Sequence, residues 1–143
     1  MTVLPLEGIR IADFGQIIAV PYTAQMLAWL GAEVILIESR ERLTTRIWPP
    51  FAENEAGVNR SGGFNTVNSS KMSCTLNLRD PKGVALAKQI ISVGAVSLEK
   101  KDSGTMQRVG LVYEDVRRIR PEARNFIFGP ICPTAHMHAR VGS

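Results

Sequence analysis

The sequence predicts an α/β protein in which a mainly parallel sheet is flanked by helices. Residues 9–14 alternate apolar and polar side chains, and residues 32–37 are almost continuously apolar, as strands of a buried parallel sheet are. Between these two segments, residues 19–30 place apolar side chains at helical spacing. A strand, a helix and a second strand in this order form a βαβ unit, whose crossover should be right-handed.

Turn and capping residues bound these elements. Gly15 follows the first strand, Pro21 suits a first helical turn, and Gly31 is placed to cap the far end of that helix. Asp80 is expected to N-cap a second helix, which has a proline at its first position and continues until Gly94. The helix boundaries are therefore predicted independently of the apolar pattern.

The remaining elements continue the alternation of strands and helices. The strands are expected at residues 74–78, 95–98 and 125–128, a third helix at 113–120, and a single helical turn at 104–109. We expect residues 1–130 to form one α/β domain and residues 131–143, which have no periodicity, to form an irregular C-terminal tail.

Residues 41–70 interrupt this regular order. They contain Pro, Gly, Asn and Ser in turn-forming combinations and little periodicity. An excursion of this length inside a compact domain is usually functional or mobile. We therefore predict no helix or strand in this segment.

Composition and charge narrow the class of ligand. The chain has 143 residues, of which 45% are apolar, enough for one core. The net charge is +4, but the 17 basic residues are mixed with 13 acidic ones, which favours a small phosphorylated ligand over nucleic acid. Cys74 and Cys132 lack the short paired spacing of a zinc or redox motif, and His136 and His138 lie in the expected tail. We expect no metal.

The sequence also lacks the patterns that direct a chain to a membrane. It does not open with a basic and apolar leader, and no apolar run approaches the roughly 18 residues that a membrane span needs. We therefore expect a cytoplasmic protein with no membrane partner.

Several segments carry a family resemblance. Residues 5–14 read PLEGIRIADF, residues 30–35 read LGAEVI, and residues 68–78 read NSSKMSCTLNL. These segments resemble "PLxGxxVLDF", "LGADVIKVE" and "NxNKRSxxLDL" of the family III CoA-transferases, the group that includes formyl-CoA transferase, carnitine CoA-transferase and 2-methylacyl-CoA racemase. Shorter matches fall in the same order, at residues 19–21, 80–83, 106–111 and 113–121. Independent short matches would rarely fall in sequence, so the resemblance is to the N-terminal part of this family.

The resemblance implies a Rossmann-like domain that binds the nucleotide of coenzyme A or an acyl-CoA. The implied contacts lie after the strands and on basic residues, namely Ile17, Ile18, Ser39, Arg40, Leu76, Arg79, Lys100, Lys101 and Arg108. Coenzyme A carries a 3′-phosphate and a pyrophosphate. Cations at strand ends would match this charge, while apolar turn residues would pack against the adenine or the pantetheine.

Two positions depart from the family pattern. Members usually have an arginine directly after the glutamate of the second strand, where this chain has Ser39 before Arg40. Members also usually read "VENFRPG" where residues 98–104 read LEKKDSG, so that an Asn-Phe pair is replaced by Lys100 and Lys101. A stacking or hydrogen-bonding surface is thereby exchanged for a charged one.

The family's nucleophile is not recognisable in the sequence. Members use an aspartate that follows a "GxGxxGP" loop and attacks the acyl-CoA. Residues 128–130, which read FGP, are the last trace of the pattern, and no aspartate follows them. Asp102 and Asp115 do not occupy that motif. The resemblance therefore implies a truncated CoA-transferase large domain that binds CoA or acyl-CoA but has no transferase activity on its own.

Other interpretations stay open. The chain is alternatively a truncated remnant that acts as a homo-oligomeric interaction or structural protein, because loss of the rest of a domain exposes apolar surface. It is otherwise one half of a split CoA-transferase that a complementary chain completes. Glu38 ends the second predicted strand, where dinucleotide-binding folds have an acidic residue that binds the ribose. However, the turn after the first strand lacks their GxGxxG motif. The basic residues also fit a solvated face, and Met26 and Trp29 are expected in the core or in an interface.

Overall fold

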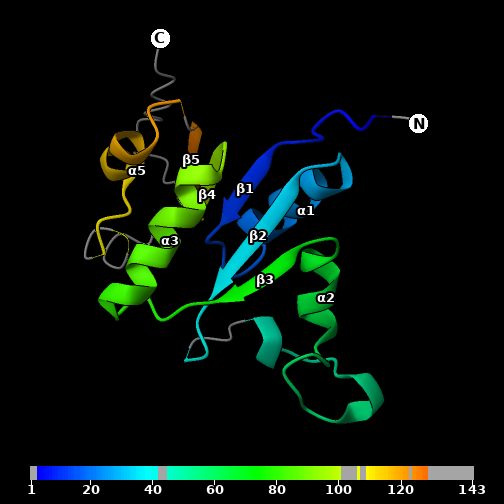
Figure 1. The fold of residues 1–143 in the computed structure, drawn as a ribbon. Helices are drawn as coiled ribbons and strands as arrows, with labels where there is room; N and C mark the ends of the chain where they lie inside the picture. The colour runs from blue at the N-terminus through cyan, green and yellow to red at the C-terminus, as the bar shows by residue number, and fades with distance from the viewer. Residues whose placement is uncertain (1–2, 42–44, 101–105, 107–108, 123, 129–143) are drawn as a thin grey trace, which may run out of the picture.

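The computed structural model describes residues 3–41, 45–100, 106, 109–122 and 124–128. Its sheet has five strands, which are β1 (Arg10–Asp13), β2 (Glu33–Glu38), β3 (Met72–Thr75), β4 (Val96–Lys100) and β5 (Arg124–Phe128). The helices are α1 (Ala19–Trp29), α2 (Gly62–Asn68), α3 (Pro81–Val93) and α5 (Tyr113–Ile119), with short 3₁₀ turns η1 (Thr45–Ile47) and η2 (Ala52–Asn54). Figure 1 shows their arrangement.

The strands lie in the order β3-β2-β1-β4-β5, and every neighbouring pair is parallel. The chain first moves outward from β1 through β2 to β3 and then returns to add β4 and β5 on the other side of β1. All five strands consequently end at one edge of the sheet, which we name the carboxyl edge. The predicted α/β class with a mainly parallel sheet is confirmed.

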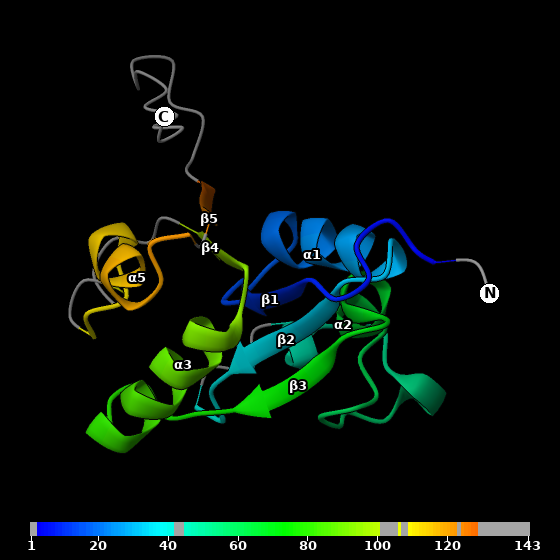
Figure 2. The same cartoon turned by 45° about the horizontal axis from the view of Figure 1, so that its top comes forward.

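Two apolar clusters cover the two faces of the sheet. On one face, Ile11, Val34 and Leu98 pack with Val20 and Ala24 of α1. On the other face, a second cluster joins the sheet to α3 and α5, and its buried members are Ala12, Phe14, Ile37, Leu76, Ala87, Ile91, Leu111 and Val116. In Figure 2, α1 and α3 lie on opposite sides of the strands.

Most predicted elements are confirmed, because their signals are local. Asp80 N-caps α3, with its Oδ1 accepting a hydrogen bond from the backbone N–H of Lys82 at 2.8 Å. Gly31 follows α1 with a φ of 103°, a conformation that favours glycine, and a side chain there would also meet Leu4. Both boundaries of one strand were wrong, since β3 runs from Met72 to Thr75 instead of over residues 74–78.

The prediction that residues 41–70 hold no regular structure was also wrong. The described part of this segment contains η1, η2 and the two-turn helix α2. Ser61 N-caps α2, accepting a hydrogen bond from the backbone N–H of Phe64, and its hydroxyl also lies 2.7 Å from the carbonyl oxygens of Thr45 and Trp48. The excursion is therefore folded back on itself.

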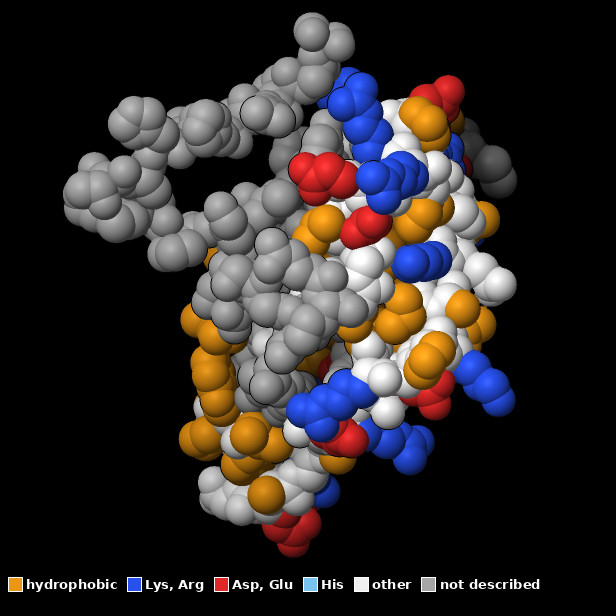
Figure 3. Space-filling view, turned by 90° about the vertical axis from the view of Figure 1, so that its left-hand side faces the viewer, with side chains coloured by type: hydrophobic (Ala, Val, Ile, Leu, Met, Phe, Trp, Pro, Cys, Tyr) orange, Lys and Arg blue, Asp and Glu red, His pale blue; other side chains and the backbone are white. Residues whose placement is uncertain are grey.

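The outer side of α1 is apolar and exposed. Met26 and Trp29 are 42% and 51% exposed, so the core position predicted for them is wrong, and the interface remains a prediction. The exposed apolar side chains on this helix and at its ends are Ile18, Tyr22, Met26, Trp29 and Leu30, which we name the α1 stripe. By contrast, the face that holds α3 and α5 mixes basic, acidic and apolar side chains wherever they are visible in Figure 3.

Within the described ranges, no helix has the length and apolar composition to span a bilayer. The predicted tail at 131–143, and most of the helical turn predicted at 104–109, lie outside the described residues. The boundary predicted at residue 130 is outside them as well.

Candidate ligand-binding edge of the sheet

The carboxyl edge gathers the loops that follow each strand. β1 ends at Asp13. It lies between β2 on one side and β4 on the other. In open α/β sheets, ligands bind outside the carboxyl ends of the strands, at the point where the strand order reverses. The connection from β1 to α1 is therefore the expected position of a ligand site.

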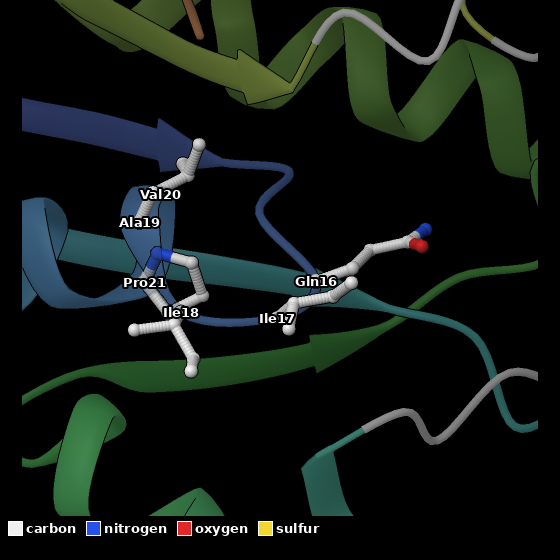
Figure 4. A pocket seen from close by; sticks show the side chains of 6 residues that line it. All are labelled: Gln16, Ile17, Ile18, Ala19, Val20 and Pro21. Atoms are coloured by element: carbon white, nitrogen blue, oxygen red, sulfur yellow. The ribbon is translucent and has the colours of Figure 1, made fainter. Parts of the chain in front are cut away.

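A shallow pocket lies in this connection. Its lining consists of consecutive residues between β1 and the first turn of α1, namely Gln16, Ile17, Ile18, Ala19, Val20 and Pro21 (Figure 4). Ile17 and Ile18, which the sequence predicts as ligand contacts, are thus among its lining residues. Ile18 is 56% exposed, which leaves apolar surface for a flat ring or an alkyl chain.

Gly15 shapes the start of this connection. A Cβ atom at this position would lie 2.6 Å from Cβ of Val20 and 2.7 Å from Cδ of Pro21. Both of these atoms are fixed close to the main chain, so a larger residue would push the first turn of α1 away from the end of β1. The glycine permits the close approach.

A buried ion pair contacts Pro21, one of the residues that line the pocket. Lys71, just before β3, places its Nζ 2.8 Å from Oδ2 of Asp13, 2.7 Å from the carbonyl oxygen of Pro21 and 2.9 Å from Oδ1 of Asn68. The side chains of Lys71 and Asp13 are 1% and 0% exposed. The second carboxylate oxygen of Asp13 accepts a hydrogen bond of 2.7 Å from the backbone N–H of Gly15.

Burial dominates the titration of this pair. It raises the pKa of Asp13, against the opposing effects of the Lys71 charge and of the hydrogen bonds from Lys71 and Gly15. It lowers the pKa of Lys71, against the attraction of Asp13. Asp13 caps the turn at Gly15 and also places a buried polar group where the strand order reverses.

A second buried pair follows β2. Arg46 donates to both carboxylate oxygens of Glu38, at 2.7 and 2.6 Å, and its guanidinium also reaches the carbonyl oxygen of Val58 and Oδ1 of Asn59. The guanidinium lies 3.6 Å from the ring centre of Phe64. These contacts fix the excursion to the end of β2.

The pKa of Glu38 is lower than its ordinary value. Burial alone would raise this pKa, but hydrogen bonds from Arg46 and Ser73, together with the charge of Arg46, outweigh it. The Glu38 carboxylate already accepts three hydrogen bonds, from Arg46 and Ser73, so it holds the excursion and β3 in place instead of standing free for a ribose, as the dinucleotide interpretation requires.

The predicted contacts near β2 and β3 come together at the carboxyl edge. Ser39 and Arg40 directly follow β2, and Arg79 follows β3. Arg79 donates to Oε2 of Glu41 at 3.0 Å, while the hydroxyl of Ser39 accepts a hydrogen bond from the backbone N–H of Glu41. Arg40 and Arg79 are both exposed. Their guanidinium groups are therefore within reach of a dissolved anion.

The other predicted contacts have different surroundings. Leu76 is 8% exposed and belongs to the cluster beneath α3, so its side chain supports the core. Lys100 ends β4 at the same edge, but its side chain lies outside the described part of the structure. Lys101 and Arg108 lie outside the described residues altogether.

Sequence reasoning missed the roles of Lys71 and Arg46. Lys71 lies in the segment NSSKMSCTLNL that carries the family resemblance, which was the one signal that could have drawn attention to it. Arg46 lies in the excursion with no pattern around it. Among the described residues, no cluster of three or more His, Cys, Asp or Glu side chains is arranged to hold a metal ion.

The strand order and the helices on both faces of the sheet define a doubly wound α/β domain. Residues 6–123 match the family model for CoA-transferase family III. The chain belongs to this family, whose members use acyl-CoA substrates.

Individual relatives agree with this assignment. The chain is 39% identical over 119 residues to succinyl-CoA:glutarate CoA-transferase of Mus musculus, a match that covers 82% of this chain and 26% of the relative. It is 31% identical over 127 residues to formyl-CoA:oxalate CoA-transferase of Streptomyces coelicolor, covering 85% and 28%. The chain thus spans between a quarter and a third of the length of these relatives.

Solved structures give the same result. A CAIB/BAIF family protein from Brucella suis superposes with a TM-score of 0.79 at 30% identity, covering 88% of this chain and 33% of that one. Rv3272 from Mycobacterium tuberculosis, in its orthorhombic form, also gives a TM-score of 0.79 at 28% identity, covering 98% and 38%.

Proposed function

We propose that this chain is a CoA- or acyl-CoA-binding domain that does not catalyse transfer on its own. The observation that carries the proposal is the combination, at one edge of the sheet, of the pocket at residues 16–21 with the exposed cations Arg40 and Arg79. An apolar hollow beside dispersed positive charge suits a molecule that is apolar at its rings and alkyl segments and anionic at its phosphates.

The proposal concerns the 143 residues themselves. They correspond to about a quarter of the curated CoA-transferases that they resemble, so the relatives' transfer reactions are not assigned to them. We expect ligand binding without turnover when the chain is mixed with an acyl-CoA and a carboxylate.

Calorimetric titration tests the proposal. We expect CoA to bind, and Arg79→Gln to weaken its binding by about tenfold, the loss of one hydrogen bond between charged groups. Arg124→Gln is the matched control, because Arg124 begins β5 at the opposite edge and is also exposed. We expect 3′-dephospho-CoA to bind more weakly than CoA. If neither CoA nor 3′-dephospho-CoA produced a heat of binding, the proposal would be rejected.

The α1 stripe favours a second candidate function, self-association as a homo-oligomer. Its side chains include Tyr22 and Trp29, at 49% and 51% exposure, and α1 carries no charged residue. Two copies of such a helix can pair without burying charged side chains away from water. The stripe presents on the order of 500 Å² per copy, so that a symmetric pair would bury about 1,000 Å², near the lower limit for a specific interface.

Light scattering distinguishes this candidate. We expect a dimer for the unsubstituted chain and a monomer for Trp29→Glu, since a buried unpaired carboxylate opposes association. Leu86→Glu is the control, because Leu86 is exposed to a similar degree, at 49%, but lies on α3 at the other face. A monomer at every concentration tested, or equal disruption by both substitutions, would count against the α1 stripe.

A further inference from the structure

Lys71 joins three separate segments through one ammonium group. Its Nζ donates to Asp13 at the end of β1, to the carbonyl oxygen of Pro21 in the first turn of α1, and to Asn68 at the end of α2. The distances are 2.8, 2.7 and 2.9 Å. A protonated lysine has three N–H donors, and each of these acceptors can take one.

This arrangement leaves Lys71 unsuited to bind a ligand directly. Its side chain is 1% exposed, and its donors are matched by three protein acceptors. A phosphate would have to displace one of them and enter a buried position. Lys71 therefore supports the carboxyl edge from inside the protein, whereas the exposed Arg79 is accessible to a ligand.

Lys71 holds both ends of the β1–α1 connection. At one end it contacts Pro21, which lines the pocket. At the other end it contacts Asp13, whose second oxygen receives the N–H of Gly15. We propose that Lys71 is a positioning residue, which sets the shape of the pocket at residues 16–21 without touching the ligand. The expected effect of Lys71 on the affinity for CoA rests on the proposed function. Its expected effect on the structure of the β1–α1 connection does not.

Neighbouring contacts give the lysine a rigid base. Gln25 of α1 accepts a hydrogen bond from the backbone N–H of Ser69 at 2.9 Å and donates to the carbonyl oxygen of Thr66 at 3.0 Å. The segment that carries Lys71 is thus fixed to the middle of α1, and Lys71 extends the attachment to its first turn. A buried ion pair is weak evidence for stability alone, but contacts to three segments specify one arrangement.

Amide hydrogen exchange in Lys71→Met tests the effect on the loop without a ligand. The informative amides are those of Gly15, bonded to Asp13, and of Tyr22, bonded to the carbonyl oxygen of Ile18. The reference is the amide of Ala95, bonded to the carbonyl oxygen of Arg10 at the other end of the sheet. We expect exchange at Gly15 and Tyr22 to accelerate at least about tenfold more than at Ala95, the signature of local opening.

A matched control separates positioning from general destabilisation. Val116→Ala removes core volume at a residue that is 1% exposed and lies on α5, on the opposite face of the sheet from α1. We expect this variant to accelerate the three amides together and to leave the CoA dissociation constant unchanged. Lys71→Met should raise that constant by about tenfold under conditions where both variants are folded. Should Lys71→Met not fold, the double substitution Asp13→Asn/Lys71→Met removes both charges and still leaves Pro21 unsupported.

Equal acceleration at all three amides in the Lys71 variant would overturn the inference. Faster exchange in the loop with an unchanged dissociation constant would also overturn it, because the shape of the loop would then not determine binding. If the unsubstituted chain fails to bind CoA while the loop opens as expected, the proposed function fails, and the positioning of the loop by Lys71 stands.

Discussion

Replacing Asp13 with alanine is expected to lower the free energy of unfolding by about 3–5 kcal/mol at neutral pH, the usual cost of removing one partner of a buried ion pair. The substitution leaves the Lys71 ammonium, 1% exposed, with only the neutral oxygens of Pro21 and Asn68. It also removes the acceptor for the N–H of Gly15. Denaturant unfolding followed by circular dichroism measures the change.

Glu53→Gln provides the comparison for Asp13. Glu53 pairs with Arg60, but its side chain is 82% exposed, so solvent screens the pair and its loss should have no measurable effect. Comparable losses from the two substitutions would mean that the Asp13–Lys71 pair contributes no more to the free energy of unfolding than an exposed pair does.

Arg46→Met is expected to cost a similar amount, about 3–5 kcal/mol at pH 7, because it leaves the carboxylate of Glu38 without its charged partner. The side chains of Arg46 and Glu38 are 9% and 11% exposed. We further expect proteases to cleave the excursion faster, since Arg46 also holds Val58 and Asn59.

The deficit caused by Arg46→Met should depend on pH. In the unsubstituted chain the pKa of Glu38 lies below its ordinary value of 4.5, so its contribution to stability is complete above that pH and is lost as the pH falls through the folded-state pKa. The difference between the two proteins should therefore shrink as the pH is lowered below about 4.5. A difference that stays constant from neutral to acid pH would show that Glu38 and Arg46 are not coupled.

The sequence predicted the elements whose signals are local. β1, α1 and β2 follow from apolar periodicity and from Gly15 and Gly31, and α3 follows from its Asp80 cap. The end of β3 was not predictable in this way. Leu76 continues the alternating pattern and still donates its backbone N–H to the carbonyl oxygen of Glu38, but β2 ends at Glu38. Beyond it, Asn77 forms a turn with Arg79 and Asp80 that leads into α3.

The candidate site was predictable only in part. The family resemblance directed attention to Ile17, Ile18, Ser39, Arg40 and Arg79, which the structure places at the carboxyl edge. The buried contacts that support this edge join residues far apart in sequence, such as Lys71 with Asp13 and Ser69 with Gln25. A single sequence contains no signal for such pairs. For the same reason α2, which opens with two glycines, could not be expected without its contacts to α1.

The most direct test is a crystal structure of the chain grown with coenzyme A at saturating concentration. We predict that the nucleotide lies at the carboxyl edge, with an apolar part against Ile17 or Ile18 and phosphate oxygens within hydrogen-bonding distance of Arg40 or Arg79. Coenzyme A bound on another face, or a carboxyl edge without ligand in crystals grown under these conditions, would contradict the account.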